Sequence, residues 1–105
     1  MHKRETLISA SSASSGSASF YLQGASEFSI RLASSADTFD YTVRATLTES
    51  ESLATGHVIA GPVNDAAAGS HLLEFTDKQY YAIAVGYSDM DSGTMSVFVN
   101  TGGVE

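Results

Sequence analysis

The chain has 105 residues, 43% of them hydrophobic, and a formal net charge of −7, which fits one globular domain with one core. It has no cysteine, so disulfides and thiolate metal sites are excluded. From Thr6 onward there are three basic and eleven acidic residues, a net charge of −8. A body this acidic repels phosphate backbones, so we expect no nucleic-acid partner.

The N-terminal segment begins Met-His-Lys-Arg-Glu-Thr and continues with only two apolar residues, Leu7 and Ile8, before a serine tract. No stretch resembles a secretory signal or a membrane-spanning helix, so we expect no membrane partner. The tract Ser9–Ser19 (SASSASSGSAS) holds seven serines, three alanines and one glycine. Such side chains bury too little apolar area to offset the entropy of ordering. We therefore expect residues 1–19 to form an arm without helix that makes few contacts with the domain of residues 20–105.

Residues 18–23 are expected to form the first strand of that domain, and residues 27–47 a hairpin. Phe28, Ile30 and Leu32 alternate with polar or small residues, and the same alternation continues from Phe39 to Leu47, which is typical of strands with one buried face. A turn at Ser34–Asp37 would pair Phe28 with Val43, Ile30 with Tyr41 and Leu32 with Phe39. It would also place two salt bridges on the outer face, Glu27–Arg44 and Arg31–Asp40.

Two short strands, 58–60 and 71–76, flank Asn64–Gly69, which is expected to be a loop or a single helical turn. A second hairpin is expected over residues 79–99, with its loop at Asp89–Gly93. In that hairpin Ile83, Val85, Met95, Val97 and Val99 would share the core face with Tyr81 and Tyr87. Tyr80, Ala82, Ala84 and Phe98 would make the opposite face apolar too, and an exposed apolar face usually marks an interface.

These elements predict an all-β protein: a single antiparallel β-sandwich of about seven strands, immunoglobulin-like or jelly-roll-like, with an extended N-terminal arm. A small closed barrel is the alternative.

No motif supports catalysis or cofactor binding, and we expect neither an enzyme nor a bound cofactor or metal. Asp89–Gly93 (DMDSG) lacks the further ligands of a calcium loop, and His2, His57 and His71 form no metal-binding spacing. There is no GxSxG turn and no phosphate-binding loop.

The N-terminus without a signal, the Ser/Ala tract, the acidic cysteine-free body and the C-terminal SVFVNTGGVE resemble small structural proteins of tailed-bacteriophage virions, of the capsid-decoration (cement) or head- or tail-associated type. The resemblance implies a homo-oligomer, such as a trimer, that binds the major capsid protein or another virion protein and resides in the virion. The resemblance implies that Leu7 and Ile8 anchor the arm on a partner, and the apolar outer face of the second hairpin adds Tyr80 and Phe98 as expected interface residues. The alternative is a carbohydrate- or surface-binding module that uses exposed tyrosines and the Asp-rich loop, with Tyr80 and Asp91 as its test positions.

Overall fold

The protein is described by a computed structural model covering residues 3–22, 25–48, 51–52, 56–76 and 78–101. Among these residues there is no helix, and hence none that could cross a membrane. The six strands in this part of the chain are β1 (Lys3–Ser11), β2 (Gly16–Tyr21), β3 (Phe28–Thr46), β4 (His57–Phe75), β5 (Ala82–Ser88) and β6 (Met95–Thr101).

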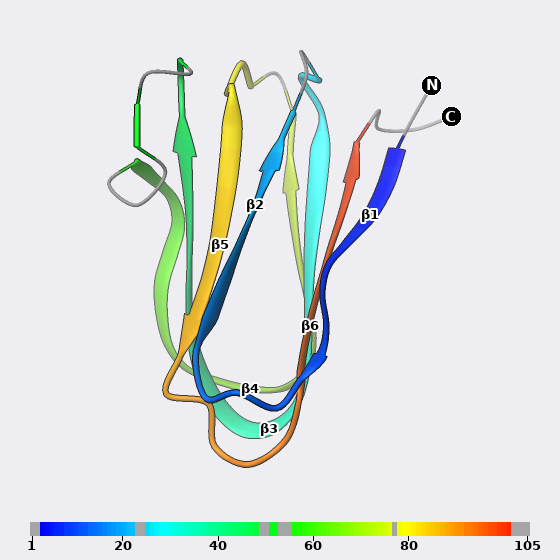
Figure 1. Ribbon diagram of the computed structural model, residues 1–105, viewed down its shortest axis with the longest axis vertical. Coiled ribbons are helices and arrows are strands. Elements are labelled where there is room, and N and C mark those ends of the chain that lie inside the picture. Colours follow the sequence, from blue (N-terminus) through cyan, green and yellow to red (C-terminus); the bar gives the residue numbers. More distant parts are fainter. Residues whose placement is uncertain (1–2, 23–24, 49–50, 53–55, 77, 102–105) are drawn as a thin grey trace.

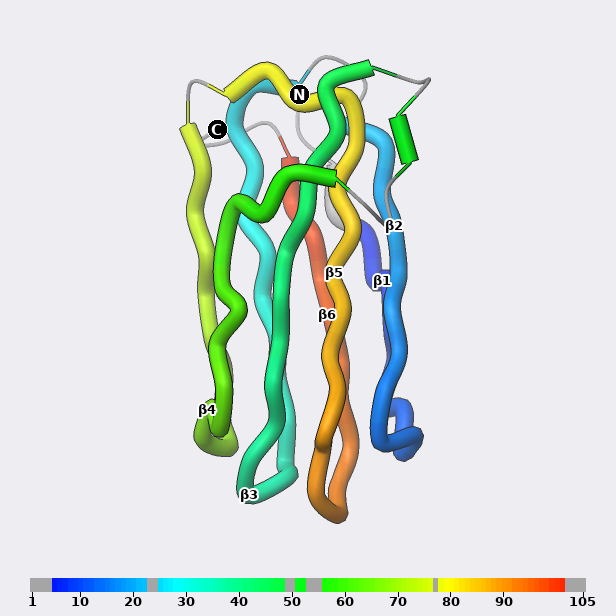
Figure 2. The backbone as a smooth tube through the Cα atoms, turned by 90° about the vertical axis from the view of Figure 1, so that its left-hand side faces the viewer, coloured from blue at the N-terminus to red at the C-terminus, as the bar shows by residue number. Residues whose placement is uncertain are grey.

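All strand pairs are antiparallel, and they form one sheet in the order β1-β6-β3-β5-β2, with β4 paired along β3. The first half of β3 pairs with β6 and its second half pairs with β5. Because β3 and β4 both bend midway, the sheet folds over on itself into two facing layers (Figures 1 and 2). The result is a nearly closed, flattened barrel measuring 36 × 31 × 18 Å. The all-β antiparallel class is confirmed, with six strands instead of about seven.

The bend in β3 replaces the turn expected at Ser34–Asp37. Ala36 is fully buried there, and its amide donates to Ser34 Oγ at 3.0 Å. The amide of Ser35 donates to the carbonyl of Thr94 at 3.1 Å, so the neighbouring connection holds the bend from outside. The pairing of β3 with β4 loses register at this point and resumes beyond it. The expected strands 58–60 and 71–76 are thus the two halves of β4, and Asn64–Gly69 forms its bend.

The hairpin register expected within residues 27–47 is wrong, because both halves of β3 pair with other strands. Ile30 lies opposite Val99 and Leu73, not Tyr41. Neither expected charge pair lies across neighbouring strands, because Arg31 lies between Phe98 and Leu72, and Arg44 lies between Ala84 and Val58.

The expected 79–99 hairpin is also wrong: β5 pairs with β2 and β3, whereas β6 pairs with β1 and β3. The assignment of inner faces succeeds even where the pairing fails. Period two fixes which side chains point inward but not which strand lies alongside. The fully buried core consists largely of the alternating residues of β3, β5 and β6, namely Ile30, Leu32, Phe39, Val43, Ile83, Val85, Met95, Val97 and Val99. Three positions depart from the expected faces: Tyr81 precedes β5 and is exposed, Leu47 follows β3 and is exposed, and Ala82 is fully buried although the pattern predicts it on the outer face.

The Ser/Ala tract is part of the sheet. Its absence of helix is confirmed, but the expectation of few contacts is wrong, because β1 pairs with β6 and β2 pairs with β5. Tyr87 Oη lies 3.1 Å from Ser11 Oγ and 3.2 Å from the carbonyl oxygen of Ala13, and its single O–H is shared between these two acceptors. A Cβ on Gly16 would lie 3.0 Å from the Tyr87 ring. Backbone hydrogen bonds and small side chains that permit close approach order this tract, not burial of its own side chains.

Candidate functional site

The residues that sequence reasoning considered for metal or acid–base chemistry have structural partners. His71 Nε2 lies 2.7 Å from the carbonyl oxygen of Ala67, and its ring meets Phe39 edge-on. Asp91 accepts a hydrogen bond from the amide of Ser92, as turn aspartates do. Among the described residues, no group of three or more His, Asp or Glu is placed to hold a metal ion. The features that remain are two outer faces, one on each layer of the barrel.

The first, here called the Phe98 face, is formed by Ser29, Arg31, Leu72, Phe98 and Asn100 on β3, β4 and β6. The Arg31 guanidinium lies over the Phe98 ring, 4.5 Å from its centroid. Leu72 is 58% exposed, the highest value among the large hydrophobic side chains that the structure describes. These side chains border a hollow of about 320 Å³. An aromatic ring beside an arginine is typical of the centre of protein interfaces, and the exposed leucine adds apolar area next to them.

Asn100 gives this face a polar feature. Its Oδ1 is buried and has no hydrogen-bond donor among the described residues. Asn100 lines both the Phe98 hollow and a neighbouring one of about 260 Å³ next to Phe28 and Phe75. A buried acceptor without a donor costs about 1–3 kcal/mol, so a donor entering either hollow would recover that free energy.

The second face, here called the Arg44 groove, crosses β2, β5 and the second half of β3. Its volume is about 560 Å³, within the range of small-molecule sites. Its outward-facing residues are Ser17, Ser19, Thr42, Arg44, Ala84, Gly86 and Ser88. Ala84 and Gly86 leave the floor almost without side chains, and hydroxyl groups flank it on both sides.

The two ends of the Arg44 groove differ in charge. At one end Arg44 donates through Nη1 to the carbonyl of Gly56 at 3.1 Å, which fixes the position of the guanidinium. At the other end Ser88 pairs with Asp40, and Asp40 lies within hydrogen-bonding reach of Asp89. The hydrogen bond to Asp40 is the main cause that raises the pKa of Asp89, and the charge of Asp40 adds to it. The amide of Asp65 donates to Asp40 Oδ1 at 2.9 Å.

Two exposed tyrosines lie beyond the Arg44 end of the groove, Tyr21 on β2 and Tyr81 directly before β5. Ser17, Ser19 and Tyr21 alternate along this strand and are all exposed, so Tyr21 extends the groove wall. The rings of Tyr21 and Tyr81 meet edge to face with centroids 5.5 Å apart.

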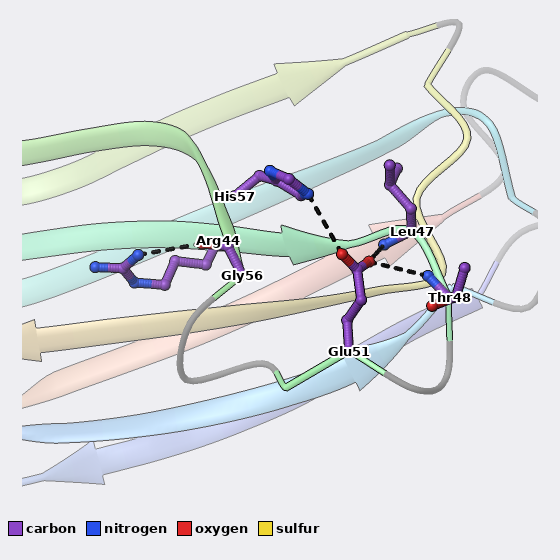
Figure 3. A network of polar contacts seen from close by, with 6 residues as sticks. All are labelled: Arg44, Leu47, Thr48, Glu51, Gly56 and His57. Carbon is purple, nitrogen blue, oxygen red and sulfur yellow. Dashed lines mark hydrogen bonds and ion pairs between the residues drawn. The ribbon is translucent and has the colours of Figure 1, made fainter.

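A network beside Arg44 ties the end of β3 to the start of β4 (Figure 3). Glu51 accepts hydrogen bonds from the amides of Leu47 and Thr48, and its Oε2 lies 3.5 Å from His57 Nε2. The hydrogen bond from the Leu47 amide is the largest cause that lowers the pKa of Glu51 below 4.5. Desolvation is the next largest and opposes it, and the Thr48 amide and His57 lower the pKa further.

The four residues expected at an interface do not lie on one face. Leu7 and Ile8 are half-buried and pack against the core. Tyr80 is also half-buried and meets Phe28 edge-on at 6.3 Å. Of the four, only Phe98 lies among the side chains of an outer hollow. The shared hairpin face expected for Tyr80 and Phe98 does not exist, because β5 and β6 belong to different layers.

Sequence reasoning missed the Arg44 groove and the Tyr21–Tyr81 pair. The alternation of Ser17, Ser19 and Tyr21 is a usable signal for one wall. Nothing local could reveal that β2, β5 and β3 lie side by side.

No protein-family model matches the chain, and no curated protein matches it. Among solved structures, it is similar to the crystal structure of SPBc2 prophage-derived protein YomS, with a TM-score of 0.70 and 9% identity over 97% of this chain and 94% of that one. It also matches a structure described as "CBM4 structure and function", with a TM-score of 0.46 and 12% identity over 93% of this chain and 66% of that one. At such identities similarity concerns the fold alone, and the chain shares its fold with a prophage-derived protein.

Proposed function

We propose that this protein is a non-enzymatic structural component of a phage particle. In this proposal it stabilises a capsid or a related assembly in the manner of a decoration protein. The Phe98 face carries the proposal, because it combines an exposed leucine, an arginine-covered aromatic ring and a buried acceptor without a donor among the described residues. The partner is the major capsid protein or another virion protein, and the protein acts there as a homo-oligomer, with a trimer as one form.

Two further observations support this proposal. The fold is shared with a prophage-derived protein, which is in keeping with a phage origin. In addition, the Phe98 face has a positively charged residue, Arg31, at its centre, whereas the chain as a whole is acidic. A partner that stacks against Phe98 and donates a hydrogen bond to Asn100 would fill the hollow. Arg31 would keep its contact with the Phe98 ring in that complex.

The test is co-sedimentation of the purified protein with phage particles that lack it. Leu72→Ser should weaken binding roughly tenfold or more, as loss of a central interface side chain does. Val58→Ser is the matched control, because Val58 lies on the same strand and is 44% exposed away from the Phe98 face. Circular dichroism should show that both variants are folded.

Two results would contradict the proposal. One is a folded Leu72→Ser variant that binds particles as tightly as the unaltered protein. The other is the absence of the protein from gradient-purified virions.

A further inference from the structure

The Arg44 groove lies on the layer opposite the Phe98 face and takes no part in the function proposed above. We propose that it binds a neutral oligosaccharide of two or three sugar units, with one ring against Tyr21. Three features support this assignment: the residues that line the groove, the charges at its two ends, and the pair Tyr21–Tyr81 next to it.

The floor of the groove admits close approach by a ligand, because Ala84 and Gly86 leave it almost without side chains. A Cβ placed on Gly86 would make only ordinary van der Waals contacts, the nearest at 3.9 Å to the carbonyl oxygen of Gly16, so the backbone of β5 leaves room for a side chain here. Ser17, Ser19, Thr42 and Ser88 place hydroxyl groups on the flanks. Each hydroxyl both donates and accepts hydrogen bonds, as the hydroxyl groups of a sugar do.

The charges at the two ends select a neutral ligand. Arg44 offers only donors, whereas Asp40 offers acceptors beside Asp89. An anionic ligand that fills the groove would lie close to these carboxylates, and a cationic ligand would lie close to Arg44. Sugar hydroxyls can accept from the guanidinium at one end and donate to a carboxylate at the other, without burying a net charge.

The tyrosine pair provides the apolar contact that hydroxyl groups cannot. Tyr21 is 53% exposed and Tyr81 is 39% exposed. The edge of one ring rests on the face of the other, so Tyr21 is held in place beside Ser19. A held, exposed aromatic ring at the end of a polar groove suits the apolar face of a pyranose ring.

Binding should be measured on an array of neutral hexose and N-acetylhexosamine oligosaccharides, with sialylated and sulfated versions printed beside them. The strongest neutral binder is then titrated calorimetrically. Gly86→Leu should abolish measurable binding, because its side chain fills the floor while the backbone has room for a Cβ. Tyr21→Ala should weaken binding about three- to tenfold.

Thr6→Leu is the matched control, since Thr6 is exposed on β1, away from the groove, and it should bind as the unaltered protein does. Thermal unfolding checks that every variant is folded. The proposal is overturned if only anionic sugars bind, if no sugar on the array binds, or if folded Gly86→Leu binds normally. These results do not depend on particle binding through the Phe98 face, so the two proposals fail separately.

Discussion

Single glycine positions determine whether the bends of the barrel can form. Gly93 has a φ of 129°, and a Cβ there would lie 2.7 Å from the amide nitrogen of Ala36. Ala36 is fully buried in the bend of β3. The connection between β5 and β6 can therefore pack against that bend only if residue 93 has no side chain.

Gly93→Ala should lower the free energy of unfolding by about 2 kcal/mol or more, because it adds a backbone clash to an unfavourable φ. Gly69→Ala separates these two effects, since Gly69 has a φ of 123° and a Cβ added to it would meet no atom within 4 Å. Urea unfolding of both variants gives the comparison. Equal losses would show that contact with Ala36 contributes nothing.

At the scale of strands, alternation predicts burial, whereas the choice of partner requires the whole fold. The buried faces of β3, β5 and β6 follow from the period-two pattern of their apolar residues. The same pattern fits a hairpin that turns at Ser34–Asp37 and a continuous strand that bends there. What decides between them is the pairing of β3 with β4, β5 and β6, which depends on residues up to about 70 positions away and leaves no local signal.

The candidate site likewise combines positions that the sequence predicts with neighbours that only the strand pairing determines. The apolar character of Phe98 predicts an interface position, and the structure places this residue at an outer hollow. Its neighbours Arg31 and Leu72 come from β3 and β4, so their convergence could not be predicted from spacing. Conversely, Leu7 and Ile8 pack against the core, because the tract that follows them pairs within the sheet and does not extend away.

The stability that the Glu51 network gives to the connection between β3 and β4 should depend on pH. Its pKa is lowered, chiefly by the hydrogen bond from the Leu47 amide. A carboxyl whose pKa is lower in the folded state stabilises that state above its unfolded pKa, and this contribution is lost as the pH falls through the folded pKa. Glu51→Gln should therefore be less stable than the unaltered protein at neutral pH and equally stable near about pH 2.

Thermal unfolding from pH 7 downward tests this expectation. The amide resonances of Leu47 and Thr48 should move with the titration of Glu51, at a midpoint below 4.5. A stability difference that does not change with pH would mean that the carboxylate charge is irrelevant to this link.

For the whole molecule, the near-closure of the sheet makes the N-terminal tract indispensable. β1 and β2 form the two ends of the pairing path, and they are joined through residues 12–15. Without them, β6 and β5 would each expose an unpaired edge. The core would also lose the partial cover of Leu7 and Ile8.

Deleting residues 1–19 should therefore unfold the protein, although an arm with few contacts could be removed without loss. The deletion removes the pairing of β1 with β6 and most of the pairing of β2 with β5. It also removes the half-buried side chains of Leu7 and Ile8, each of which contributes less than the ~1.5–3 kcal/mol of a fully buried one. Together these losses approach the whole stability of a small domain, about 5–15 kcal/mol.

Ser12→Ala combined with Ser15→Ala is the control, because both side chains are exposed and the backbone is unchanged. Circular dichroism and size-exclusion chromatography should show a folded double variant and an unfolded or aggregated deletion. A deletion that keeps the β spectrum and a cooperative unfolding transition would mean that β3–β6 are stable without the tract.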